Sequence, residues 1–395
     1  MPRHRIAATL LVAVITVFLC FQTPDWPPAF NKPAREILNS TLGFQHIFAI
    51  NLPARTDRRD ALALAAALTG LDITWTSGVS GQDVHDRVLP GDPSVSRQLS
   101  FGKRGSWRAH MNVLQRIVDE NITSALIIED DADWDVRLKS QMQVFSQAAK
   151  AFTQPLNGQT VAEKHSDPPG QELPLNQLPP HMRKPRLTPY GDNWDVLWLG
   201  HCGTSFPDPS SSSIVPSFRV TIRDDETVPY PKHLRPHPFA LDDALSEAYP
   251  PYTRVVHASS GSICTQAYAV SQQGARKLLW QFGIQSFTTQ WDLMLRDWCD
   301  GSYDDLSPDS DTPHIEQHSN QLKGPVCITT QPPLFSHHYG KGAASDITAP
   351  GGGYVSKNKE MTPYIRLSVR LNMERLVKGQ EPTEQWKDDE PHLNE

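Results

Sequence analysis

An apolar segment that ends in consecutive carboxylates constrains the fold of this chain more than any other feature. Residues 124–128, Ser-Ala-Leu-Ile-Ile, place apolar side chains on both faces of a strand, which is typical of a central strand covered on both sides. Glu129, Asp130 and Asp131 follow directly. Since the carboxyl ends of strands in an open α/β sheet face the ligand crevice, we expect these acids to emerge where a substrate binds.

Three adjacent carboxylates also indicate what they bind. Crowded carboxylates repel one another, and a bound cation relieves that repulsion. Oxygen ligands select hard ions such as Mn²⁺ or Mg²⁺, which keep open positions for substrate phosphates. The run therefore predicts a site for Mn²⁺ or Mg²⁺, and a nucleoside diphosphate leaving group is one that needs such charge neutralisation. A solvated acidic turn that caps the following helix is the alternative.

Strand-like and helix-like segments alternate along the rest of the chain. Strands are expected at residues 47–52, 73–76, 193–200, 263–270 and 326–328, and helices at 57–68, 106–118, 138–152, 271–282, 290–298 and around 364–377. This alternation predicts an α/β fold with one central, mostly parallel sheet. Residues 153–192 and 201–257 show no periodic pattern and are expected to be irregular insertions.

The N-terminus has the pattern of a targeting segment. Arg3, His4 and Arg5 precede an apolar run from Ile6 to Phe21. No pair of small residues suited to signal peptidase follows, which favours a retained signal anchor over a cleaved signal peptide, the alternative. The flanking basic residues place that end in the cytosol, and the short run suits the thin membranes of the endoplasmic reticulum or Golgi. We therefore expect a single-pass type II membrane protein with a lumenal catalytic domain.

These patterns divide the chain into four parts. Residues 1–22 form the cytosolic tip and anchor, 23–44 a stem, 45–350 a single domain, and 351–395 a C-terminal helix and polar tail. The net charge of −7, with acidic and basic residues well mixed, provides no basic field for a phosphate backbone, so nucleic acid is not an expected partner.

A lumenal location also determines how the cysteines are interpreted. Beyond the anchor they are widely spaced, which favours one or two disulfides over a zinc site and leaves three pairings open. These cysteines are Cys202, Cys264, Cys299 and Cys327. N-glycosylation sequons begin at Asn39 and Asn121, as in a glycoprotein.

Several motifs occur in an order and spacing that identify a family. They are residues 49–59 (AINLPARTDRR), 105–110 (GSWRAH), 125–131 (ALIIEDD), 265–279 and the late element 345–347 (SDI). Over roughly residues 45–350 the chain resembles glycosyltransferase family 25, which includes bacterial lipopolysaccharide glycosyltransferases and procollagen galactosyltransferases. The resemblance implies a GT-A fold, a nucleotide-diphosphate sugar such as a UDP-hexose as donor, a glycan or glycoprotein hydroxyl as acceptor, and transfer with inversion.

The resemblance also assigns roles to the acidic run. It implies that Glu129 and Asp131 are the ligands of the metal and the donor phosphates, with Asp130 beside them in the donor site. His337, in the pair His337-His338, is a candidate third metal ligand, although two histidines in a surface loop would look the same.

Three residues at the end of the first strand lie where the family holds the nucleotide. They are Asn51, Arg55 and Arg58. A planar guanidinium suits phosphate or uracil oxygens. The alternative is that both arginines are ordinary surface residues paired with Asp57 and Asp60.

Inverting transfer needs a base that takes the proton of the acceptor hydroxyl. Asp292, at the start of an expected helix, is our candidate, although a carboxylate there also occurs simply because it favours the helix dipole. His110 matches the histidine of a family Ser-His element and is a candidate acceptor-binding residue, with Ala109 and Ser106 as departures from the pattern. A satisfied core histidine is the alternative.

Two other functions remain open. A catalytically silent lumenal or cell-surface adhesion module could use the same fold without turnover. A metal-dependent phosphohydrolase would need a second metal-binding cluster, and the nearest candidate, residues 224–226 (Asp-Asp-Glu), lies in a stretch expected to be irregular.

Overall fold

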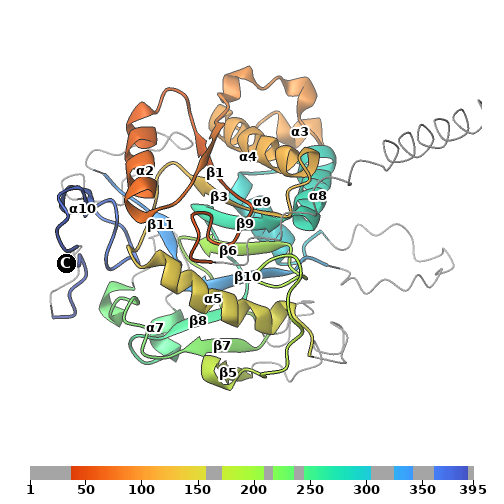
Figure 1. Cartoon of the computed structure of the whole chain (residues 1–395). Coiled ribbons are helices and arrows are strands. Elements are labelled where there is room, and N and C mark those ends of the chain that lie inside the picture. The colour runs from red at the N-terminus through yellow and green to blue at the C-terminus, as the bar shows by residue number, and fades with distance from the viewer. Residues whose placement is uncertain are drawn as a thin grey trace, which may run out of the picture.

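The computed structural model describes residues 37–156, 171–208, 217–234, 244–303, 324–340 and 360–389. The expected anchor, most of the stem and the element at 345–347 lie outside these residues. Among the helices of the described part, none has the length and apolar character needed to cross a membrane. The centre of the molecule is one large sheet flanked by helices, which confirms the α/β class and a single domain (Figure 1).

The sheet is mixed, and its main path runs β2-β1-β3-β9-β6-β10-β8-β7-β5. In that order the strands are Thr74–Ser77, His46–Asn51, Ser124–Glu129, Ala267–Ser271, Val196–Gly200, Cys327–Gln331, Arg254–Ala258, Arg219–Ile222 and Glu172–Pro174. Strand β9 runs antiparallel to both β3 and β6, and β8 runs antiparallel to β10 and β7. The expectation of a mostly parallel sheet is therefore wrong. A strand buried on both faces has the same apolar pattern in either direction, so the pattern did not reveal the orientation of β9.

Helices cover both faces of the sheet. Helices α2 (Thr56–Thr69) and α5 (Leu138–Thr153) pack with Leu126 and Ile128 of β3, whereas α4 (Phe101–Asp119), α8 (Gln272–Trp280) and α9 (Trp291–Cys299) pack with Ala125 and Ile127. Successive side chains of β3 therefore enter opposite cores, because a strand alternates its side chains. The short helices are α3 (Pro93–Ser96), α7 (Ala244–Ala248) and α10 (Met373–Val377).

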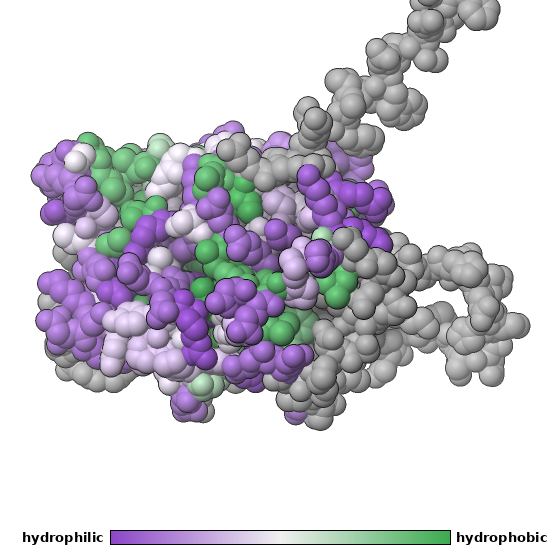
Figure 2. Space-filling model, turned by 60° about the horizontal axis from the view of Figure 1, so that its bottom comes forward, coloured by the Kyte–Doolittle hydropathy of each residue, from purple (hydrophilic) through white to green (hydrophobic). Residues whose placement is uncertain are grey.

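Parts of the stretches expected to be irregular are ordered. Strands β5 and β7, helix α7 and the start of β8 all come from residues 153–192 and 201–257. These elements are three to five residues long, too short to produce a recognisable period in the sequence. On the face turned forward in Figure 2, hydrophilic side chains predominate and hydrophobic ones lie among them in patches, as on a surface exposed to water.

The C-terminal segment belongs to the domain and is not a separate tail. Only residues 373–377 of the helix expected at 364–377 form a helix, α10. Before it, Ser368 forms a bridge with Asp135, and the Val369 amide donates to the Trp134 carbonyl. Backbone pairing with the domain fixes this stretch, so a helical period alone was a poor guide here.

Two disulfides settle the pairings that the sequence left open. Cys202 bonds to Cys264, and Cys299 bonds to Cys327. The first joins the segments that follow β6 and precede β9. The second joins the end of α9 to the start of β10.

The sheet forks at the edge where β1, β3 and β6 end. Strand β6 changes register with β9 between Trp198 and Gly200, and Gly200 pairs with β11 (Phe335–His337). Strand β11 in turn pairs antiparallel with β4 (Ala132–Trp134). A Cβ at Gly200 would lie 2.7 Å from the backbone nitrogen of Ala267, so glycine suits the point of division. Only residues 130 and 131 link β3 to β4, which places them at the fork.

Candidate active site

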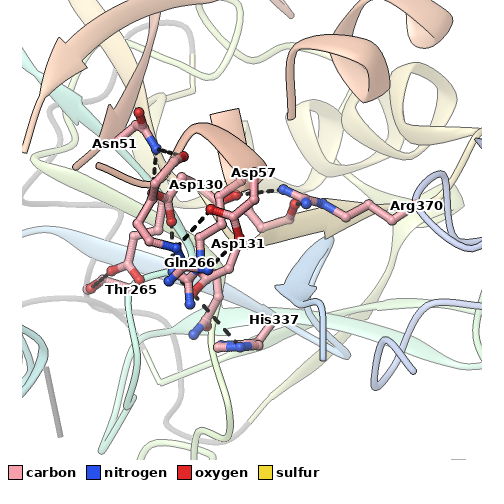
Figure 3. Close-up of polar contacts among 12 residues, drawn as sticks. Asn51, Asp57, Asp130, Asp131, Thr265, Gln266, His337 and Arg370 are labelled. Atoms are coloured by element: carbon pink, nitrogen blue, oxygen red, sulfur yellow. Dashed lines mark hydrogen bonds and ion pairs between the residues drawn. The ribbon is translucent and has the colours of Figure 1, made fainter. Parts of the chain in front are cut away.

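The two carboxylates at the fork are held by groups from the first strand and helix. The Arg58 Nη1 atom lies 2.8 Å from Asp130 Oδ1 and 2.8 Å from Asp131 Oδ2. The Asn51 amide donates to Asp130 Oδ2 at 2.8 Å (Figure 3). Because β1 and β3 are adjacent and parallel, residues beyond their ends meet at one edge. The structure thus brings together four residues predicted for the donor and metal sites.

Arg55 behaves differently from Arg58. Its guanidinium makes two bonds to Asp57, Nε to Oδ1 at 2.9 Å and Nη2 to Oδ2 at 2.7 Å. The Asp57 side chain is exposed, so this pair lies at the rim of the carboxylate cluster. The pairing expected of a surface arginine is therefore seen for Arg55, whereas Arg58 contacts Asp130 and Asp131. The donor-binding role of both arginines stays a prediction.

Asp131 is the carboxylate best prepared to bind a cation. Burial raises the pKa of its carboxyl group, but the charges of His337, Arg58 and Arg370 outweigh burial and lower the pKa below its usual value. Asp131 therefore remains ionised at neutral pH. Its Oδ2 contacts Arg58, while Oδ1 is buried without a hydrogen-bond partner.

The carboxyl group of Glu129 is turned toward other side chains. Its Oε1 accepts a hydrogen bond from the Thr265 hydroxyl at 2.7 Å and lies 3.9 Å from His110 Nε2. Burial, and then the charge of Asp131, raises the pKa of Glu129 to about 8. The role of Glu129 as a metal ligand stays a prediction, because a bound cation would favour the ionised form of this carboxyl group.

His110 lies in the core beneath Glu129. The residue is 2% exposed, its Nδ1 lies 2.9 Å from the Tyr268 hydroxyl, and its ring stacks on Trp291. Burial lowers the pKa of His110 to about 3, so the ring is neutral. This is the core alternative, and it corrects the expectation that His110 contacts the acceptor, since a ring enclosed by aromatic side chains is inaccessible to a glycan.

Asp292 occupies the first turn of α9, close enough to Glu129 for its charge to raise the pKa of that residue. Its Oδ2 accepts a hydrogen bond from the Cys264 amide at 2.9 Å. Burial raises the pKa of Asp292, opposed by backbone donors that include Cys264. The Asp292 carboxylate thus lies near Glu129 and also holds the loop before β9 through the Cys264 amide.

The two late histidines face different carboxylates. His337 Nε2 lies 3.8 Å from Asp131 Oδ2, and burial lowers the pKa of the His337 ring. His338 instead contacts the Thr362 hydroxyl and lies 4.0 Å from Asp133 Oδ2. The prediction that selected His337 as the residue near the acidic run is consistent with this placement.

Two site residues carried no recognisable signal in the sequence. The Thr265 hydroxyl binds Glu129, and the Arg370 guanidinium donates to the backbone carbonyls of Asp130 and Ala132. Thr265 lies within a family motif that was interpreted only as part of a strand and helix. Arg370 lies in the segment expected to be a helix and tail, and its partners are backbone atoms, which leave no sequence pattern.

The chemistry of these groups allows a simple test of whether an ion would fit. Within the described ranges, no three His, Cys, Asp or Glu side chains are arranged to hold a metal by themselves. Asp131 Oδ1 is nevertheless buried without a hydrogen-bond partner, and His337 Nε2 lies 3.8 Å from Asp131 Oδ2. Mg²⁺ and similar hard ions usually take only one or two carboxylates from the protein and fill their other positions with phosphates and water. Asp131 with His337 beside it fits that requirement.

Comparisons with known proteins agree with these features. The family described as "Glycosyltransferase family 25 (LPS biosynthesis protein)" matches residues 44–295. A "Glycosyltransferase 25 family member" of Anopheles gambiae is 33% identical over 106 residues, 24% of this chain and 18% of the relative. "Procollagen galactosyltransferase 1" of Danio rerio is 30% identical over 120 residues, 28% and 20% of the two chains.

A further relative, the "Probable inactive glycosyltransferase 25 family member 3" of Bos taurus, is 23% identical over 167 residues, 40% of this chain and 28% of the relative. The matches to the insect and fish proteins thus cover about a fifth of those relatives' own length.

Proposed function

Because the chain belongs to glycosyltransferase family 25, we propose that it transfers a hexose from a nucleotide-diphosphate sugar, such as a UDP-hexose, to a hydroxyl group of a glycan or glycoprotein. Transfer would depend on Mn²⁺ or Mg²⁺ and proceed with inversion. The observation that carries the proposal is the turn at Asp130 and Asp131, which offers an ionised carboxylate with one buried, unpaired oxygen at the carboxyl edge of the sheet.

In the proposed donor site, Asp131 and His337 would hold the ion. An ion bound there would neutralise the diphosphate as its bond to the sugar breaks. Arg58 and Asn51 hold Asp130 and thereby fix the first half of the turn. These bonds keep Asp131 in place before the donor arrives, so little reorganisation is needed during the reaction.

Asp292 is the proposed base. A single displacement with inversion requires a group that removes the acceptor proton from the side opposite the leaving group. The hydrogen bond from the Cys264 amide orients the carboxylate, and the raised pKa makes Asp292 a stronger base than an exposed aspartate. Asp292 and the turn at Asp130 and Asp131 are connected through Cys264, Thr265 and Glu129, and the transferred sugar would be bound beside these residues.

The proposed location is the lumen of the Golgi or endoplasmic reticulum, with residues 1–22 as a membrane anchor. Two disulfides within the domain support an oxidising compartment.

A catalytically silent lumenal or cell-surface adhesion module is the second candidate. One observation favours it, since Arg58 pairs with both Asp130 and Asp131 and so reduces their need for a cation. A phosphohydrolase is less well supported, because Asp225, in the nearest alternative acidic run, is engaged by Arg254 at 2.7 Å.

A panel of nucleotide-diphosphate sugars tests the proposal. The full chain is incubated with each sugar and Mn²⁺, with EDTA as the control, and release of the nucleoside diphosphate is measured. We expect metal-dependent release from one class of donor, abolished by Asp131→Ala and retained by Asp60→Ala, which alters an exposed acid on the same helix as Arg58. Folded protein that neither binds nor cleaves any donor would favour the silent module.

A further inference from the structure

We propose that Arg370 is a positioning residue of the donor site and that residues 360–389, which carry it, form one side of that site. The inference rests on the proposed function, because it concerns how Asp131 is placed to hold an ion. The family match ends at residue 295, so this segment lies outside the matched part of the chain.

Arg370 contacts the backbone on both sides of Asp131, in the turn at Asp130 and Asp131 that is the proposed metal site. Its Nε donates to the Ala132 carbonyl at 2.9 Å, and its Nη2 donates to the Asp130 carbonyl at 2.6 Å (Figure 3). These two carbonyls flank Asp131. A planar guanidinium has the rigid fork of donors needed to reach two acceptors at once, which an ammonium group lacks. One side chain therefore fixes the backbone immediately before and after Asp131.

The segment that carries Arg370 is anchored to a buried carboxylate two residues beyond Asp131. Asp133 is fully buried, and its Oδ2 accepts hydrogen bonds from the Thr362 and Ser368 hydroxyl groups. Its Oδ1 accepts from the Arg370 amide at 3.1 Å. If this segment detached, Asp133 would lose these three donors and keep the Trp134 amide, and a buried carboxylate that loses hydrogen bonds is destabilising. The anchor therefore holds Arg370 against the turn.

Arg370 and Arg58 act on different parts of the turn. Arg58 contacts the side chains of Asp130 and Asp131, whereas Arg370 contacts the backbone carbonyls on either side of Asp131. Asp131 is thus positioned through both its side chain and its backbone. Because Arg370 acts through Asp131, its loss should weaken the binding of the ion more than the binding of the nucleotide itself.

Calorimetric titration of the full chain with UDP, with Mn²⁺ or with EDTA, tests this role. Arg370→Lys keeps the charge but loses the fork, and Arg370→Met loses both. Arg375→Lys is the matched control, because Arg375 Nε also donates to a backbone carbonyl, that of Glu381, within the same segment. In both Arg370 variants we expect the Kd for UDP to rise at least about tenfold with Mn²⁺ and to change little in EDTA. The control should bind as the unaltered protein does.

Hydrogen exchange provides a measurement that needs no variant. UDP with Mn²⁺ should slow exchange at residues 367–372 as well as at 130–132, because Arg370 couples the two. Unchanged UDP affinity in both Arg370 variants, or slowed exchange confined to residues 130–132, would overturn the inference while leaving the proposed function intact. If the unaltered protein takes up no UDP, the proposed function fails, and this inference fails with it.

Discussion

Replacement of Asp131 by alanine separates the chemistry of the site from the stability of the fold. In the structure Asp131 shares Arg58 with Asp130, so Arg58 keeps Asp130 as a carboxylate partner in the variant. A hydrogen bond to a charged group contributes about 1.5–3 kcal/mol. The variant also removes a buried charge that raises the pKa of both Glu129 and Asp130 by repulsion, and this offsets part of the loss. We expect the free energy of unfolding to change by less than about 2 kcal/mol.

The effect on turnover should be much larger. Without Asp131, His337 is the one proposed protein ligand left, and the ion can no longer be held where it would neutralise the leaving diphosphate. Loss of such stabilisation costs about 4 kcal/mol, roughly a thousandfold in kcat. Asp131→Asn should behave similarly, because it keeps the shape of the side chain but not its charge.

Two measurements decide the matter. The kcat is measured with saturating Mn²⁺ and the donor found in the panel, and the free energy of unfolding is measured by urea denaturation. Asp60→Ala, which alters an exposed acid, should leave both unchanged. A kcat within tenfold of the unaltered enzyme in a folded Asp131→Ala protein would refute the assignment of Asp131 as the essential metal ligand.

Three further predictions concern the base, a buried histidine and a disulfide. Asp292→Asn should lower kcat at least about 100-fold without changing donor affinity. Asp300→Asn, which alters another carboxylate that binds the same loop, should leave kcat unchanged. A kcat for Asp292→Asn equal to that of the unaltered protein would mean that another residue is the base. Burial lowers the pKa of His257 to about 3 in the folded protein. In the unfolded chain the same imidazole binds a proton near pH 6.5. The free energy of unfolding therefore decreases as the pH falls below about 6.5. Urea denaturation of His257→Gln should therefore show about 2 kcal/mol less acid destabilisation between about pH 7.5 and pH 5, and an unchanged pH dependence would contradict the buried neutral ring. Joint replacement of Cys202 and Cys264 by alanine opens a cross-link between residues 62 positions apart and should lower the free energy of unfolding by about 4 kcal/mol; a loss below about 1 kcal/mol would argue against this role.

The part of the site that could be predicted from the sequence follows from local pattern and strand geometry. The apolar run of β3 and the acids after it indicated a buried strand that ends in a crevice. Since β1 and β3 are adjacent and parallel, Asn51 and Arg58 necessarily lie near Asp130. These contacts required only that two strand ends meet at one edge.

The rest depends on relationships that a linear pattern does not contain. The direction of β9 is invisible in a strand buried on both faces. Arg370 binds a carbonyl 240 residues away in the chain, and any residue type can supply a carbonyl. Glu129 accepts a hydrogen bond from Thr265, and the sequence gives no sign that this one hydroxyl group meets the acidic run.

The division of the sheet at Gly200 limits how this site can change during evolution. The link between β3 and β4 has only two residues. The strands on either side of it pair with different partners, β3 with β9 and β4 with β11. An insertion or deletion there would have to shift one whole ladder, so the link has almost no freedom in length.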